Sequence, residues 1–179
     1  INMPIFLTLL PEIIIFIGAC SLLILGLFVK KINVINNVSI LLIIIAISLI
    51  VLQPVQSILQ NSFIVDEFSK VFKIMILIGS FTCLVMFNSS KDDLNINIYE
   101  FPILILFASI GMLIMVSSND LLSMFVGLEL QSLSLYVLAS LNRNSLLSSE
   151  AGIKYFILGA LSSGLLLFGI SYIYGFTGK

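Results

Sequence analysis

Glu129 has the clearest capacity for chemistry in this sequence. It lies in an apolar run nine residues after Asp120, and at 1.5 Å per residue a helix starting there carries it about 13 Å along its axis, close to the midplane of a bilayer. An ionised carboxylate at that depth costs about 2.5–3.5 kcal/mol, so such groups are protonated, paired or hydrated, and they commonly belong to proton relays. We therefore predict a proton-relay or ion-pair role. The alternative is a protonated carboxyl that only helps two helices to pack.

Polar neighbours on the same predicted helix support this interpretation. Ser132 follows Glu129 by three positions and Tyr136 by seven, so the three side chains can share one helix face. Gln131 and Ser134 lie on an adjoining face. We expect Ser132 and Tyr136 to be supporting polar residues, although serine and glutamine side chains also join membrane helices without any chemical role.

A second candidate proton carrier is Lys154, in the first turn of the next predicted helix. Its long side chain can either reach the membrane interface or face the interior of the helix bundle and carry a proton. Further along are two small-residue pairs spaced four apart, Gly159 with Ser163 and Ala160 with Gly164. Such pairs let another helix approach closely, so they predict helix packing.

Composition excludes several classes of protein. The chain has 179 residues, 60% of them apolar and only 9% charged, with a mean hydropathy of +1.23. A soluble fold could not cover its surface with so few charges, so we predict an all-α integral membrane protein. The net charge of −1 and the absence of histidine argue against a nucleic-acid surface and a histidine-ligated metal site. Cys20 and Cys83 have no ligand spacing and are interpreted as apolar filler.

Charged and turn-forming residues divide the chain into about six membrane-spanning helices within a single transmembrane domain, 1–179. A span needs about 20 apolar residues. The predicted helices are 4–29, 38–52, 68–87, 101–116, 121–141 and 151–174. The connector 53–67 is expected at the membrane interface, and 88–100 as an exposed loop.

Charged residues at the helix ends are expected to cap a helix or to lie at the membrane interface. Asp120 is expected to cap the fifth helix through its side-chain oxygen. Glu12 is expected at the outer interface, where the helix dipole favours an acid. Lys70 and Lys73 are expected to reach back to the lipid headgroups.

The distribution of lysine and arginine predicts the orientation, because inner loops carry an excess of these residues. With six membrane crossings, five basic residues fall on the side of the odd-numbered loops and three on the other side. This places the odd loops on the matrix or cytoplasmic side and both termini outside. The first group is Lys30, Lys31, Lys91, Arg143 and Lys154, and the second is Lys70, Lys73 and Lys179.

Several stretches together resemble the N-terminal part of NADH dehydrogenase subunit 2, an antiporter-like membrane subunit of respiratory complex I. They are LLPEIIIFIGACSLLILGLF near the start, VDEFSKVFK at 65–73, GLELQSLSLYVLAS at 127–140 and SEAGIKYFILGALSSGLLLFGISYIYGFTG at 149–178. The resemblance covers essentially the whole chain, and the last two stretches are specific.

The resemblance implies two inverted five-helix repeats, each with a broken helix, and a line of buried lysines and glutamates that carries protons while quinone is reduced elsewhere. Glu129 matches the family's helix-five glutamate, which is expected to pair with a lysine on helix seven. Lys154 matches the lysine that opens helix six. Family members continue for several more helices beyond the position of Lys179, so the helix-seven lysine is missing from this sequence. We favour a split subunit completed by a second chain, with a truncated product or partial sequence as the alternative, and the small-residue face of 151–174 as the seam.

The predicted function is therefore that of a membrane-arm subunit of proton-pumping NADH:ubiquinone oxidoreductase, contributing to proton translocation coupled to quinone reduction. The enzymatic label belongs to the assembled complex. No catalytic, metal or cofactor-binding residue is expected on this chain, with FMN, iron–sulfur clusters and ubiquinone elsewhere in the complex. Expected partners are other membrane-arm subunits, a second chain carrying the missing helices, and lipids, with no nucleic acid.

An isoleucine-, phenylalanine- and asparagine-rich composition favours the mitochondrial inner membrane over a bacterial plasma membrane. Two other functions remain open at this point. One is a subunit of a stand-alone cation/proton antiporter. The other is a structural membrane scaffold without a proton path of its own.

Overall fold

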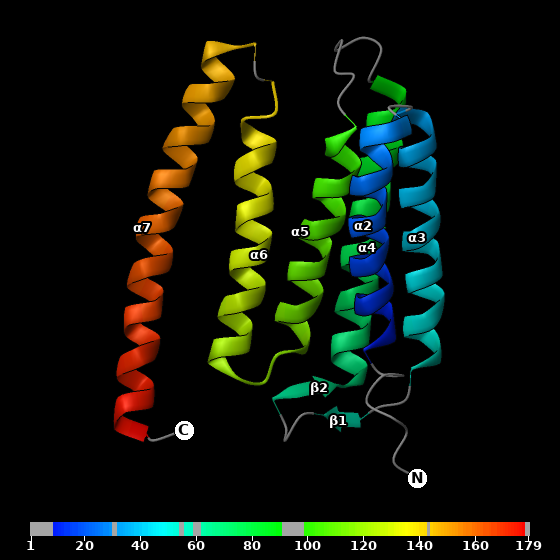
Figure 1. Ribbon diagram of the computed structural model, residues 1–179. Helices are drawn as coiled ribbons and strands as arrows, with labels where there is room; N and C mark the ends of the chain where they lie inside the picture. Colours follow the sequence, from blue (N-terminus) through cyan, green and yellow to red (C-terminus); the bar gives the residue numbers. More distant parts are fainter. Residues whose placement is uncertain are drawn as a thin grey trace.

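The fold is a set of long helices standing side by side, with one small hairpin at one end (Figure 1). The computed structural model describes residues 9–29, 32–53, 56–58, 62–90, 99–142 and 144–177. The helices are α2 (Leu10–Val29), α3 (Ile32–Leu52), α4 (Glu67–Ser90), α5 (Glu100–Ser117), α6 (Leu121–Ala139) and α7 (Leu146–Thr177). Strands β1 (Gln56–Ile58) and β2 (Phe63–Val65) pair antiparallel, with Ser57 opposite Ile64.

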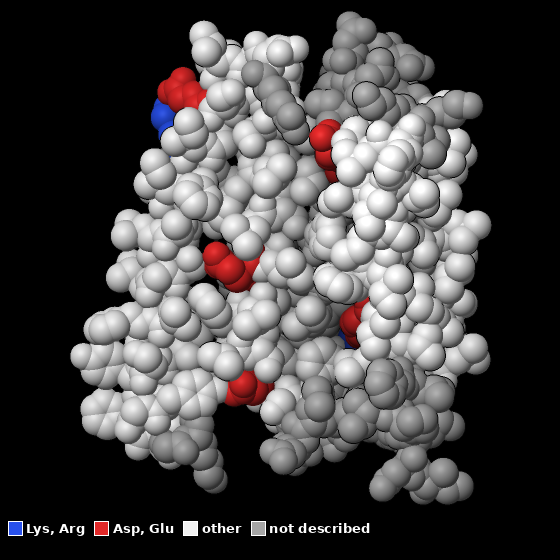
Figure 2. Space-filling view, viewed as in Figure 1, with Lys and Arg blue, Asp and Glu red and all other residues white. Residues whose placement is uncertain are grey.

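All six helices are long and apolar enough to cross a membrane. They contain 18 to 32 residues, with mean hydropathies between 1.6 and 2.7. The space-filling view shows an almost entirely white face with a few isolated acidic and basic side chains (Figure 2). Many large apolar side chains, such as Phe28, Leu52 and Phe176, point outward. An apolar exterior is what lipid tails require, so the predicted all-α membrane fold is confirmed.

Helices α2 to α5 form a four-helix bundle, in which α3 and α5 each pack against both α2 and α4. Helix α6 packs on α5, and α7 packs on α6, so the last two helices extend the bundle to one side (Figure 1). The core lies among the first four helices and is built from isoleucine, leucine and alanine. Its fully buried members include Ile15, Ile43, Leu77, Leu84 and Leu106.

Two helices begin well before their predicted starts. Helix α3 begins at Ile32, six residues before the predicted start, because Asn36 is buried and its Nδ2 donates to the Leu84 carbonyl of α4 at 3.2 Å. Helix α7 begins at Leu146, five residues early. There the Ser145 hydroxyl accepts from the Ser148 N–H at 3.4 Å and caps the first turn. The predicted start of the first helix, at residue 4, lies outside the described residues.

The predicted interfacial connector 53–67 contains the hairpin, which sequence analysis missed. Phe63 and Val65 of β2 are buried, and Phe63 forms a bridge with Ser118 in the turn between α5 and α6. The Asn119 N–H donates to the Ser62 carbonyl at 2.9 Å in the same place. The hairpin therefore packs against the bundle end where α2, α4 and α6 begin. Of the predicted loop 88–100, residues 91–98 are not among the described ones.

Candidate proton-transfer site

Glu129 lies at the middle of α6, as predicted, and it is half-buried. Its Oε2 atom is buried and accepts no hydrogen bond from the described residues. Burying a carboxylate oxygen without a hydrogen-bond donor in an apolar helix is unfavourable in free energy, so this group needs a proton, a water molecule or a cation. Its role in a proton relay or an ion pair stays a prediction.

A close approach of two glycines fixes the position of α6 against α5. A Cβ atom added at Gly127 would lie 2.8 Å from the carbonyl oxygen of Gly111, and one at Gly111 would lie 2.6 Å from the Gly127 carbonyl. The two backbones therefore touch two residues before Glu129, which makes α6 a rigid support for it. Sequence analysis missed this contact; the small residues themselves, Gly111 and Gly127, were the only available signal.

The predicted supporting residues lie on α6 but are not hydrogen-bonded to Glu129. Ser132 donates to the Leu128 carbonyl of its own helix at 2.8 Å. Tyr136 is buried and makes edge-to-face contacts with Tyr155 and Phe156 of α7, with ring centroids 4.8 and 5.7 Å apart. In this structure both residues stabilise helices. Their part in proton transfer stays a prediction.

On α7, Lys154 points to the outside. Its Nζ lies 2.5 Å from Oε1 of Glu150, one turn earlier, and the lysine side chain is 70% exposed. Because α7 begins at Leu146, Lys154 is in its third turn and not in the first. No described residue other than Glu150 forms an ion pair with it, and its role in proton transfer stays a prediction.

The small residues of α7 divide between two faces. A side chain at Gly159 would collide with the Tyr136 hydroxyl, so this position packs directly on α6. Ser163 is half-buried beyond it, whereas Ala160 and Gly164 are exposed, with no atom near a Cβ at Gly164. The Gly159–Ser163 pair thus serves the α6–α7 contact, and the other pair presents an open face.

Asp120 occupies the N-cap position of α6, but the expected side-chain capping bond is not formed. Its Oδ1 instead accepts a hydrogen bond from the Tyr174 hydroxyl near the end of α7. This bond is the main cause that lowers the pKa of the Asp120 carboxyl below its ordinary value of 3.8. The acid therefore joins two helices at the membrane boundary.

The predictions for Glu12 and Lys73 were wrong, because the two residues face each other inside the bundle. The Lys73 Nζ lies 2.5 Å from Glu12 Oε1, with the lysine side chain 0% and the glutamate side chain 7% exposed. Both side chains are therefore enclosed within the bundle and do not point outward. Lys70, by contrast, pairs with Glu67 at 3.0 Å, and that glutamate is exposed.

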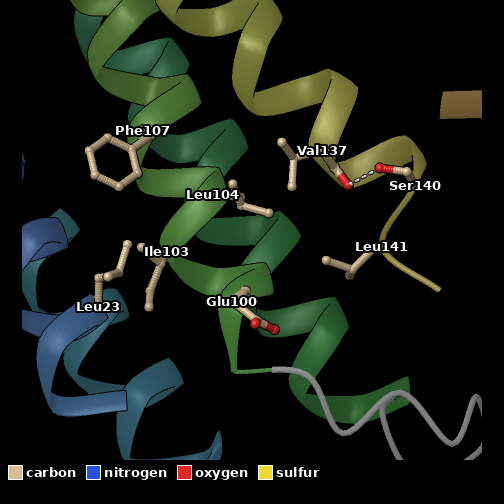
Figure 3. A pocket seen from close by; sticks show the side chains of 8 residues that line it. All are labelled: Leu23, Glu100, Ile103, Leu104, Phe107, Val137, Ser140 and Leu141. Carbon is tan, nitrogen blue, oxygen red and sulfur yellow. Dashed lines mark hydrogen bonds between the residues drawn. The ribbon is translucent and has the colours of Figure 1, made fainter. Parts of the chain in front are cut away.

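Two cavities lie beside α5. The smaller, of about 170 Å³, is lined by side chains from α2, α5, the end of α6 and the two residues that follow α6, which are drawn in Figure 3. Its single charged wall residue is Glu100. The larger, of about 480 Å³, lies between α2, β2, α5 and α6 and includes Glu12 in its wall.

Comparison with known proteins identifies relatives of this architecture. A family model described as the transmembrane region of NADH:quinone oxidoreductase/Mrp antiporter proteins matches residues 118–179. NADH-quinone oxidoreductase subunit N of Bartonella bacilliformis is 48% identical over 173 residues, 95% of this chain and 36% of that protein. Subunit N 1 of Rhizobium meliloti is 44% identical over 172 residues, 94% of this chain and 36% of that protein.

Solved structures agree with these relatives. A chain of respiratory complex I from Thermus thermophilus superposes with a TM-score of 0.79 at 30% identity, over 94% of this chain and 37% of that one. A chain of an archaeal membrane-bound sulfane sulfur reductase superposes with a TM-score of 0.68 at 23% identity, over 97% of this chain and 37% of that one. This similarity shows a shared fold. This chain spans a little over a third of the length of these proteins. The comparisons support the predicted resemblance to antiporter-like membrane subunits.

Proposed function

We propose that this chain forms the N-terminal part of an antiporter-like membrane-arm subunit of a proton-pumping NADH:quinone oxidoreductase, equivalent to subunit N or subunit 2. The observation that carries the proposal is Glu129, a half-buried acidic residue in the middle of an apolar helix, with one carboxyl oxygen that accepts no hydrogen bond from the described residues. The similarity to bacterial subunits N supports the same assignment.

In this function Glu129 holds a proton or a cationic partner during part of the transport cycle. Lys154 is proposed as a second proton carrier on α7. The lysine that pairs with Glu129 is proposed to lie on the following helices of the subunit, on the side of α6 and α7.

The assembled enzyme completes the chemistry. We propose that FMN, iron–sulfur clusters and ubiquinone are bound by other subunits, and that the complex lies in the mitochondrial inner membrane. The isoleucine-, phenylalanine- and asparagine-rich composition supports the mitochondrial location, whereas the named relatives are bacterial.

Purification of the native membrane complex through a tag on this chain tests the proposal. We expect mass spectrometry to find quinone-reductase subunits in this preparation. The family model also covers Mrp antiporters, so a preparation containing antiporter subunits and lacking quinone-reductase subunits would contradict the proposal and favour a stand-alone antiporter.

A further inference from the structure

The hairpin of β1 and β2 lies next to the turn between α5 and α6 (Figure 1). On the side of the bundle, the ring centroid of Phe63 lies 5.9 Å from the ammonium group of Lys73, within the range of a cation–π contact, and that group is buried in its ion pair with α2. On the side of the turn, Phe63 forms a β-bridge with Ser118, and the Asn119 N–H donates to the Ser62 carbonyl at 2.9 Å. Phe63 therefore contacts both the bundle interior and the segment from which α6 starts.

Strand β2 is held firmly to the four-helix bundle. It packs against α4 and α5, and its two ends, Phe63 and Val65, are buried. The next residue, Asp66, donates its N–H to Ser69 Oγ at 2.9 Å, and the Ser69 hydroxyl donates to the Asp66 carbonyl at 2.8 Å. These bonds fix the strand to the first turn of α4. The hairpin is therefore a fixed point from which another element can be positioned.

The first half of α6 is not packed against α2. A cavity of about 480 Å³ lies between them, with Leu122 and Val126 of α6 in one wall and Phe16 of α2 in another. Phe63 of the hairpin is also part of the wall. Atoms that line an empty space lack dispersion contacts on that side, so packing with α2 does not fix this part of α6. Its position depends on the contacts with α5 and on the hairpin.

Two contacts therefore determine the tilt of α6. One is the backbone contact between Gly111 and Gly127, and the other is the bond from Asn119 to the hairpin, eight residues before Gly127. At 1.5 Å per residue the two points on α6 are about 12 Å apart. A contact between two backbones restrains the distance between helices more than the angle between them, because no side chains interlock there. Glu129 follows the glycine contact by two residues, so a change in tilt displaces its carboxyl group.

We propose that Phe63 is a positioning residue for Glu129. By joining the start of α6 to the buried ion pair, it sets the tilt of α6 and thereby the place of the Glu129 carboxyl group. Functional groups have to be held within about 0.5 Å of their productive geometry, and a displacement of about 1 Å can lower a rate about 100-fold. This inference rests on the proposed role of Glu129 in proton translocation.

The aromatic ring distinguishes this role from simple apolar filling. Phe63→Leu keeps an apolar side chain in the hairpin but offers no ring face to the Lys73 ammonium, so it loosens the link between the bundle and the turn. Phe63→Tyr keeps the ring, and the cavity beside it leaves space for the hydroxyl group. The two variants should therefore differ, although both alter the same buried position.

The test measures proton translocation per assembled complex in sealed native membranes during NADH oxidation. We expect Phe63→Leu to pump several-fold more slowly than the wild type, and Phe63→Tyr to keep most of the wild-type rate. Phe16→Leu is the matched control, because Phe16 lines the same cavity from α2 and is not part of the hairpin, so its rate should be that of the wild type. A wild-type rate in Phe63→Leu, or an equal loss in Phe16→Leu, would overturn the proposal.

A double variant shows whether Phe63 acts through Glu129. Glu129→Gln already removes the group that is being positioned, so Phe63→Leu/Glu129→Gln should pump no more slowly than Glu129→Gln alone. Losses that multiply in the double variant would overturn the proposal, because Phe63 would then act on pumping by another route.

Hydrogen exchange in the wild-type complex gives a readout that does not depend on the assembly of a variant. We expect the Asn119 amide and the first turn of α6 to exchange slowly, since the hairpin holds this segment. Exchange at Asn119 as fast as in an unbonded amide would overturn the proposal. If Phe63→Leu does not assemble, the exchange result decides.

Failure of this inference can be separated from failure of the proposed function. Slow pumping in Glu129→Gln together with a wild-type rate in Phe63→Leu would reject the positioning role alone. Unchanged pumping in Glu129→Gln would reject the proposed function, and with it any role of Phe63 that acts through Glu129.

Discussion

At the scale of single residues, the structure confirms the position of Glu129 and corrects Glu12 and Lys73. The position of Glu129 followed from counting residues along an uninterrupted apolar helix, which is local information. The Glu12–Lys73 contact joins residues 61 positions apart, and each residue alone looks like an ordinary charge near a helix end. Only the packing of α2 and α4 around a common interior reveals their pairing, and no periodicity in the sequence predicts that.

Removing one member of this pair should destabilise the bundle strongly. Lys73→Met leaves the Glu12 carboxylate buried without a cation, which typically costs about 3–5 kcal/mol. We expect a lower thermal midpoint for the solubilised complex, and substantial recovery when Glu12→Leu is added to Lys73→Met. Equal midpoints for the single and double variants would show that the unpaired carboxylate is not the cause.

At the scale of elements, the number of helices and most of their bounds were predictable because each span is a long apolar run. The errors have specific causes. Asparagines near the start of α3 indicate a loop in the sequence, but in the structure Asn36 lies within the helix and donates a hydrogen bond to α4. The serines before Glu150 also indicate a loop, but in the structure Ser145 caps the first turn of α7. Three-residue strands are too short for a period-2 pattern, so the hairpin was missed.

The end of α7 should depend on its hydrogen bond to α6. Tyr174→Phe removes the donor to Asp120, so we expect faster amide hydrogen exchange in the last turns of α7. Tyr172→Phe is the matched control, because that exposed ring makes only aromatic contacts within α7 among those described here. Equal exchange in the two variants would show that the bond does not hold the helix.

The pH dependence of this contact follows from the lowered pKa of Asp120. A carboxyl whose folded pKa is below its ordinary value stabilises the fold at pH values above 3.8. That contribution is lost as pH falls through the lowered folded pKa. At neutral pH the bond is therefore complete, and the exchange difference between Tyr174→Phe and the wild type should shrink in strong acid.

At the scale of the whole molecule, the sequence predicted the class of fold but not which helices pack together. Nearly featureless apolar spans carry little information on their neighbours. The positive-inside argument becomes stronger with the structure, because Lys73 is buried in an ion pair and no longer counts as a loop charge. The remaining balance is five basic residues on the side of the odd loops against two on the other side, Lys70 and Lys179.

This balance predicts opposite sides of the membrane for two connections. Asn142→Cys, in the exposed turn before α7, should react with a membrane-impermeant maleimide only from the inner side. Ser62→Cys, beside β2, should react only from the outer side. Parent chains with Cys20 and Cys83 alone give the background. The reverse pattern would contradict the predicted orientation.

The role of Glu129 in proton translocation is tested by the proton-translocation rate of the complex carrying Glu129→Gln, measured in sealed membrane vesicles during NADH oxidation. Glutamine keeps the shape of the side chain but cannot exchange a proton. We expect normal assembly with several-fold slower proton translocation, partial recovery in Glu129→Asp, and a wild-type rate in Glu67→Gln, which alters an exposed glutamate. A wild-type translocation rate in the assembled Glu129→Gln complex would contradict the claim and leave Glu129 as a packing residue.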